Sequence, residues 1–188
     1  HIISDDGVMI NYHIKGSKKN ALVFVHGYSC GSEYWWPQLE YFSQNYTTIA
    51  VDLAGRGKSG LNRKEYSMEA FGDDVKSVIE HLDLDQVVLI GHSMGGPVIV
   101  KAAGSLGAKS RLIIGVDTFH DLTTEGIGRF ARIAVNTMFQ LCYDSMTKDS
   151  IDDFFIDKTD KDIEDWIRID ALNTPKKNSQ STHDALPK

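Results

Sequence analysis

The sequence has no apolar stretch that approaches the ~18–20 residues of a membrane-spanning helix, so we predict no membrane span. Its basic residues form no stripe or polybasic run, and the net charge is -6, so we predict no nucleic-acid partner and no anionic membrane partner. The chain opens without a basic start followed by an apolar run, so no secretory signal is predicted and a cytoplasmic location is favoured. It also lacks an initiator Met, which leaves room for an upstream segment.

Cysteine is scarce too, because Cys30 and Cys142 are the only two in the sequence. Two cysteines are too few for a disulfide framework, and we expect free thiols in a reducing compartment. What remains is a chain of 188 residues with 41% hydrophobic residues, which is long and apolar enough to bury a core.

Short apolar runs at 21–25, 47–51, 87–90 and 111–116 alternate with helical patterns. Each run is uniformly apolar, which is typical of strands buried on both faces of a parallel sheet. The clearest helix follows Ser67, a predicted N-cap, and shows apolar residues at helical spacing at Phe71, Val75, Val78, Ile79 and Leu82. A hairpin with a turn at 5–7 and a second strand over 8–14 is expected before the first run, and a weaker helix at 32–45. The predicted class is α/β, with a mostly parallel sheet and flanking helices.

The decisive motif is Gly91-x-Ser93-x-Gly95, which directly follows a predicted buried strand and directly precedes a helix-compatible run. A sharp strand-to-helix turn places a serine hydroxyl above the sheet and leaves room only for small neighbours. We therefore predict that Ser93 is a nucleophile. The backbone N–H of Met94 and the helix N-terminus would face an oxyanion that forms there.

A second stretch agrees with this prediction, because His26-Gly27-Tyr28 follows the strand that ends at residue 25. An oxyanion hole needs a donor from this loop, and the Tyr28 N–H is the expected one. We expect His26 to brace the loop by hydrogen bonds and not to act in catalysis.

The glycine-rich stretch 52–60 invites a nucleotide-binding interpretation, because it contains G-x-G-x-x-G after a strand. That function needs a helix that starts within the motif, whereas helical periodicity resumes only near Ser67. A P-loop ending in Gly-Lys-Ser also fails, because its first glycine would fall at Asp52. Nucleotide binding is not predicted.

Three motifs occur in a fixed order: His-Gly at 26–27, Asp-x-x-Gly-x-Gly-x-Ser at 52–59 and Gly-His-Ser-Met-Gly-Gly at 91–96. In this order and spacing they resemble the α/β-hydrolase superfamily, in the branch of single-domain esterases and related hydrolases. The resemblance covers about residues 1–120. It implies a Ser-Asp-His triad, an oxyanion hole from Tyr28 and Met94, a small-molecule ester-like substrate, no metal and no organic cofactor. It also implies that 1–120 form the N-terminal part of the core and 121–188 a helical cap.

The family's acid and histidine usually follow its seventh and eighth strands, and neither strand is recognisable here. We therefore expect the sequence to be truncated before the seventh strand, with the catalytic His and the acid outside this chain. Asp117 is the one in-chain candidate for the acid, and His120 and His183 are weaker candidates for the base. Completion by another chain is an alternative explanation. The alternative function is a hydrolase-like protein that binds a ligand with little or no turnover; the oligomeric state is not predicted.

Overall fold

The computed structural model describes residues 1–118, 161–162, 165–167 and 169. Its centre is a five-stranded sheet in the order β3-β5-β4-β6-β7. The strands β4, β5, β6 and β7 pair in parallel, whereas β3 pairs antiparallel with β5 at one edge. Their bounds are Tyr12–Lys15 for β3, Asn20–Val25 for β4, Thr47–Val51 for β5, Gln86–His92 for β6 and Ser110–Val116 for β7. The predicted mostly parallel α/β sheet is confirmed.

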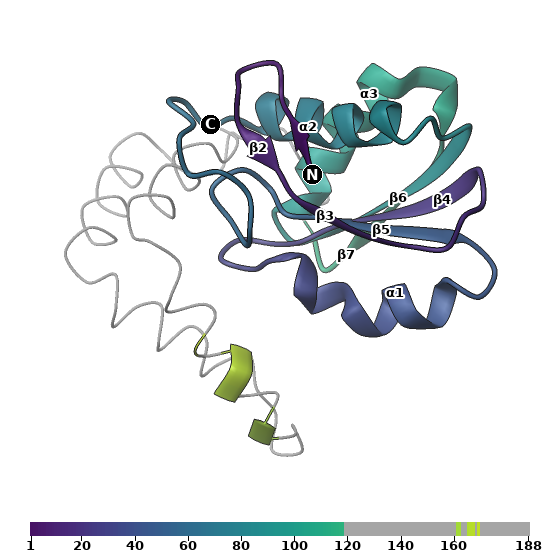
Figure 1. The fold of residues 1–188 in the computed structure, drawn as a ribbon, viewed down its shortest axis with the longest axis horizontal. Coiled ribbons are helices and arrows are strands. Elements are labelled where there is room, and N and C mark those ends of the chain that lie inside the picture. The colour runs from purple at the N-terminus through teal and green to yellow at the C-terminus, as the bar shows by residue number, and fades with distance from the viewer. Residues whose placement is uncertain (119–160, 163–164, 168, 170–188) are drawn as a thin grey trace.

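Helices cover both faces of this sheet (Figure 1). On one face lie α2 (Met68–His81) and α3 (Gly95–Leu106), which pack against each other. On the other lies α1 (Trp36–Phe42), preceded by the 3-10 turn η1 (Ser32–Trp35); a second short turn, η2 (Gly107–Lys109), leads into β7. The predicted N-cap of α2 is confirmed, because the Ser67 hydroxyl accepts a hydrogen bond of 3.0 Å from the Ala70 N–H.

The core divides into two clusters, one on each face of the sheet. The larger lies beneath α2 and α3 and includes Val23, Ile49, Phe71 and Leu89, all fully buried. The smaller lies against α1 and consists of Phe24, Leu39, Ala50 and Ile90. Neighbouring residues of one strand thus pack into clusters on opposite faces of the sheet. This is why these strands are apolar throughout and do not alternate between apolar and polar residues.

The predicted N-terminal hairpin is present, as β1 (Ile2–Ile3) paired antiparallel with β2 (Met9–Ile10). Its second strand was expected to run unbroken over 8–14, and that expectation is wrong. The chain leaves the hairpin at Asn11, whose N–H donates to the Ser59 hydroxyl at 2.8 Å and whose carbonyl accepts from the Asp52 N–H at 2.9 Å. It then continues as β3 in the main sheet, so two sheets share one extended segment.

The fourth apolar run forms β7 as predicted, but its expected burial on both faces is wrong. In the part of the chain that the structure describes, β7 pairs only with β6, and Leu112, Ile113, Ile114 and Val116 are exposed. An edge strand has one neighbour instead of two, so its side chains lack the packing that β4 and β6 receive.

No helix among the described residues is both long and apolar enough to cross a membrane. The predicted cap at 121–188 and Cys142 lie almost wholly outside the described residues. Of the cap aromatics, Trp166 is described, and its ring centroid lies 4.7 Å from that of Tyr34 in η1.

Candidate active site

Ser93 occupies the turn between β6 and α3 and has a φ of 49°, in the left-handed region. Such a conformation costs a serine about 1–3 kcal/mol and persists only where its surroundings impose it. Two backbone hydrogen bonds do so here: the Ser93 N–H donates to the Val116 carbonyl at 3.1 Å, and the Gly96 N–H donates to the Ser93 carbonyl at 2.9 Å. The strained strand-to-helix turn expected from the sequence is therefore present.

The loop that follows β4 lies directly against this turn. A Cβ placed on Gly27 would lie 3.2 Å from the Ser93 Cβ and 2.9 Å from the His92 Nδ1. Any side chain at Gly27 would push the loop away from the serine, so glycine is required for the close approach. The structure thus brings the loop that carries Tyr28 to the predicted nucleophile, while Met94 is buried at the N-terminus of α3.

His26 holds the same loop in place by hydrogen bonds, as predicted. Its Nε2 accepts a hydrogen bond of 3.1 Å from the Leu53 N–H, so its Nδ1 carries the proton and donates to the Gly27 carbonyl at 2.8 Å. Burial lowers the pKa of His26 to about 4, so the ring is neutral at pH 7. A neutral ring with both nitrogens engaged serves as a structural link between two loops.

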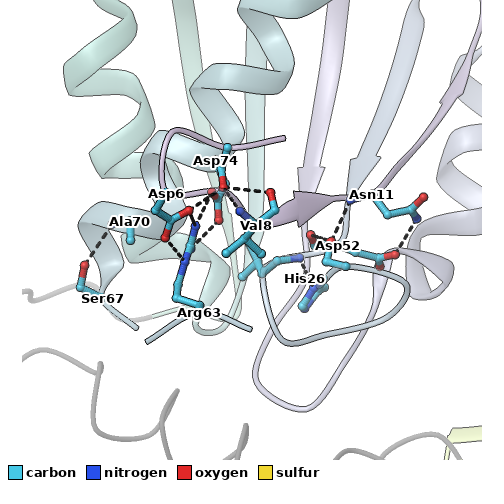
Figure 2. A network of polar contacts seen from close by, with 12 residues as sticks. Asp6, Val8, Asn11, His26, Asp52, Arg63, Ser67, Ala70 and Asp74 are labelled. Carbon is cyan, nitrogen blue, oxygen red and sulfur yellow. Dashed lines mark hydrogen bonds and ion pairs between the residues drawn. The ribbon is translucent and has the colours of Figure 1, made fainter. Parts of the chain in front are cut away.

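Asp52 lies beside His26 and is fully buried (Figure 2). Its Oδ1 accepts from the Ser32 N–H at 2.7 Å, and its Oδ2 accepts from the Lys58 N–H at 3.0 Å and the Asn11 side-chain amide at 2.8 Å. Burial acts to raise the pKa of Asp52, but the Lys58 and Ser32 amides outweigh it and hold the pKa below its usual range. One carboxylate thus joins the loop after β4, the loop after β5 and the start of β3.

The stretch 52–60 forms this loop without a helix, and the next helix begins at Met68. The expectation that no helix starts within this motif is therefore confirmed. At Gly57, with a φ of 51°, an added Cβ would lie 2.6 Å from the Asp52 Oδ2. The glycine allows the loop to close around the carboxylate.

A second polar network lies beside the first and was missed by sequence reasoning (Figure 2). The Arg63 guanidinium donates two hydrogen bonds to Asp74 at 2.7 and 2.8 Å and two to Asp6 at 2.8 and 3.0 Å. Burial raises the pKa of Asp74 to about 6 against the lowering by Arg63, whereas at half-exposed Asp6 the Arg63 hydrogen bonds lower the pKa. This network ties the N-terminal hairpin to α2.

The remaining predicted site residues divide into described and undescribed ones. Asp117 follows β7, is exposed and has a φ of 44°; its role as the acid stays a prediction. His120 and His183 lie outside the described residues. Among the described residues, no three His, Cys, Asp or Glu side chains are grouped so as to hold a metal ion.

Two contacts near the site had no recognised signal in the sequence. The Arg56 guanidinium is buried, with its central carbon 5.4 Å from the centre of the Tyr28 ring. The Thr118 hydroxyl donates to the Ser93 carbonyl at 2.6 Å. The second contact could have been sought once Ser93 was assigned. Thr118 lies just after β7, and β7 pairs with β6, the strand that leads into Ser93.

The chain matches the family model described as the alpha/beta hydrolase fold over residues 20–134, more than half of its length. Among curated proteins, it is 36% identical over 84 residues to an (E)-2-((N-methylformamido)methylene)succinate hydrolase of Acinetobacter baylyi; the match spans 45% of this chain and 32% of that protein. It is 35% identical over 97 residues to epoxide hydrolase 3 of Xenopus tropicalis, across 50% of this chain and 26% of that protein. The chain therefore matches about a third or less of the length of these two relatives.

A solved structure, an esterase from Exiguobacterium antarcticum, superposes with a TM-score of 0.85. The superposition covers 100% of this chain and 72% of the esterase, with 23% sequence identity. At that identity the likeness bears on the fold.

Proposed function

Because this chain belongs to the α/β-hydrolase fold family, we propose that Ser93 is the nucleophile of a serine hydrolase that cleaves an ester or similar acyl bond. The observation that carries the proposal is the Ser93 turn itself. A non-glycine residue with a φ of 49° sits between a buried strand and a helix N-terminus, with the glycine of a neighbouring loop against its Cβ. Backbone strain of this kind gathers at functional sites, where surrounding structure holds it in place.

In the proposed reaction, the Ser93 Oγ attacks the acyl carbon, and its proton passes to a base. The new Oγ–C bond forms as the carbonyl electron pair moves onto oxygen, and the Met94 and Tyr28 N–H groups stabilise that oxyanion. When the pair returns, the bond to the leaving alcohol breaks and the base delivers its proton to that alcohol. Water then attacks the acyl-enzyme in the same sequence and releases the acid and free Ser93.

The base in this proposal is a histidine outside the described residues, oriented by an acid for which Asp117 is the candidate within this chain. His26 does not serve as that base, because both of its ring nitrogens are engaged with backbone groups and its pKa is about 4. Asp52 does not serve as the acid partner, because its oxygens already accept three hydrogen bonds.

Ester-like substrates are proposed because a solved structure with the same fold is an esterase. The curated relatives widen the choice, because their names give a substituted succinate and epoxides as substrates. A panel of p-nitrophenyl esters, an N-acyl amide and an epoxide would separate these classes by turnover.

The test is intact mass spectrometry of the full-length protein after treatment with a fluorophosphonate. We expect one adduct, mapped to Ser93 and absent from S93A, together with loss of ester turnover in S93A of at least about 1,000-fold. The matched control is S105A, because Ser105 is an exposed serine near the far end of α3. Undiminished turnover in S93A, or an adduct that persists in it, would overturn the proposal; no adduct on the wild type would favour the ligand-binding alternative.

A further inference from the structure

The Ser93–Met94 peptide group is held in place at its carbonyl oxygen. Its carbonyl oxygen accepts two hydrogen bonds, from the Gly96 N–H at 2.9 Å and from the Thr118 hydroxyl at 2.6 Å. The N–H of the same peptide group is the Met94 N–H. A peptide group is planar, and its C=O and N–H point in opposite directions, so fixing the oxygen also fixes the direction of the N–H.

We propose that Thr118 is a positioning residue that orients and strengthens the Met94 N–H as an oxyanion donor, by binding the Ser93 carbonyl of the same peptide group. This inference rests on the proposed function and adds a role for a residue that the mechanism did not use. Donors on the carbonyl draw electron density from the amide, which makes its N–H a stronger donor. An oxyanion donor is effective because it is already in place before charge develops, so a fixed peptide plane serves the reaction directly.

The surroundings of Thr118 are shaped for this contact. A Cβ on Gly96 would lie 2.7 Å from the Thr118 Cβ, and a Cβ on Gly115 would lie 2.5 Å from the Thr118 Cγ2. Both positions must therefore lack a side chain for Thr118 to reach the turn. One glycine comes from α3 and the other from β7, so two elements leave the same space free.

The same strand end also holds the other side of the serine. The Val116 carbonyl accepts from the Ser93 N–H at 3.1 Å, two residues before Thr118. Residues 116–118 thus bind both peptide groups that flank the Ser93 Cα and hold it at a φ of 49°. The hydroxyl of Thr118 is the one side-chain contact in this arrangement, and it can be removed without changing the backbone.

The first experiment compares T118A with T118S in the full-length protein, because these two variants differ only in the hydroxyl. With p-nitrophenyl acetate we expect kcat to fall about 10-fold in T118A, KM to stay within about 2-fold, and T118S to keep most of the wild-type kcat. The rate of fluorophosphonate labelling at Ser93 should fall in parallel with kcat.

A second readout separates charge stabilisation from general binding. The Ser93 Oγ adds to the carbonyl carbon of a trifluoromethyl ketone, its proton passes to the base, and the ketone oxygen carries the negative charge in the oxyanion hole. The alcohol portion of a substrate, in contrast, binds without charge. We expect T118A to weaken inhibition by the ketone about 10-fold and to leave inhibition by a simple alcohol unchanged.

The matched control is the pair T48A and T48S. The Thr48 hydroxyl donates to the Leu39 carbonyl at 3.1 Å, the same kind of bond in a buried place away from Ser93. T48A should lower the melting temperature by a few degrees and leave kcat unchanged.

The outcomes are distinct. A wild-type kcat in T118A would overturn the role of Thr118. A loss of kcat of equal size in T118S would also overturn it. So would losses of kcat that follow the change in melting temperature in both the Thr118 and the Thr48 variants. If the wild type takes no adduct at Ser93, the proposed function fails and this inference fails with it. Labelling at Ser93 with an unaffected T118A would leave the serine hydrolase standing and remove only Thr118.

Discussion

Asp52 and Asp74 are both buried carboxylates, yet the structure satisfies them in different ways. Asp52 accepts from two backbone N–H groups and one side-chain amide, which come from three separate segments. Within the described part of the chain, Asp74 has a single hydrogen-bonding partner, the Arg63 guanidinium. The pKa is lowered at Asp52, where backbone amides outweigh burial, and raised to about 6 at Asp74, where burial outweighs the guanidinium.

The difference has a consequence for the site. A carboxylate that binds backbone amides fixes the course of the chain, because each donor belongs to a peptide group whose position is thereby set. A carboxylate that binds one arginine links two side chains, and it does not itself fix the position of a backbone peptide group. The Asp52 network therefore supports the loops beside Ser93, whereas the Arg63 network holds the N-terminal hairpin against α2.

The largest expected effect is that of D52N. The asparagine keeps the shape of Asp52 but presents an NH₂ group to at least one N–H donor, so bonds in three segments weaken together. We expect the free energy of unfolding at pH 7 to fall by about 4 kcal/mol, measured by urea titration. D85N, at an exposed aspartate, is the control and should change stability by less than about 0.5 kcal/mol. A loss below about 1 kcal/mol in D52N would show that the loops keep their course without this carboxylate.

The next effect is a pH dependence that originates at His26. Its folded pKa is about 4 and its ordinary value is 6.5, so between these values the unfolded chain binds more protons than the folded one. The contribution of His26 to stability is therefore complete above pH 6.5 and is lost as the pH falls towards 4, by up to about 3 kcal/mol.

H26Q removes this titration, so its free energy of unfolding should depend less steeply on pH than that of the wild type between pH 6.5 and 4. Taking the difference between the two proteins cancels the contribution of Asp74, whose raised pKa acts in the opposite direction over the same range. H81Q, at an exposed histidine of α2, should retain the wild-type slope. Equal slopes for H26Q and wild type would mean that His26 takes up a proton in the folded protein.

The smallest effect of the three is that of R63M, which breaks the second network. Asp74 loses its partner, but its carboxyl already has a raised pKa and can take up a proton, which limits the loss to about 2 kcal/mol at pH 7. The double variant R63M/D74N should recover at least half of that loss, because neither buried charge remains.

The control for R63M is K76M, which removes a surface ion pair with Glu80 and should cost about 0.3 kcal/mol. The contrast with Asp52 can be tested directly, because no single partner substitution should restore D52N. If R63M/D74N is no more stable than R63M, the unpaired Asp74 is not the cause of the loss in stability. The Arg63 network would then not differ from the Asp52 network in its dependence on one partner side chain.

Local signals were sufficient for much of the fold. The N-cap at Ser67, the four apolar runs and the glycine-flanked Ser93 are encoded by neighbours in the sequence, and each is present. The turn that carries Ser93 and the loop beside it could be predicted because a sharp strand-to-helix turn requires small residues at fixed spacing.

The parts that were missed depend on partners far away in the chain. Arg63 binds Asp6 across 57 residues, and no local pattern marks either residue as buried or paired. The exposure of β7 depends on which strand lies beside it, which the apolar character of its own residues does not reveal. The role proposed for Thr118 depends on its hydrogen bond to the carbonyl of Ser93, 25 residues earlier in the chain.

The division of the N-terminal segment at Asn11 also affects the order of folding during synthesis. Residues 11–15 leave the ribosome before their partners, because the Ser59 hydroxyl that accepts from the Asn11 N–H lies 48 residues later in the chain, and β5, the partner of β3, comes little earlier. Asn11 and β3 must therefore wait for these partners until β5 and the loop after it have been translated, whereas β1 and β2 can pair with each other. A stall in translation before residue 47 would leave β3 without its partner strand and Asn11 without the Ser59 hydroxyl.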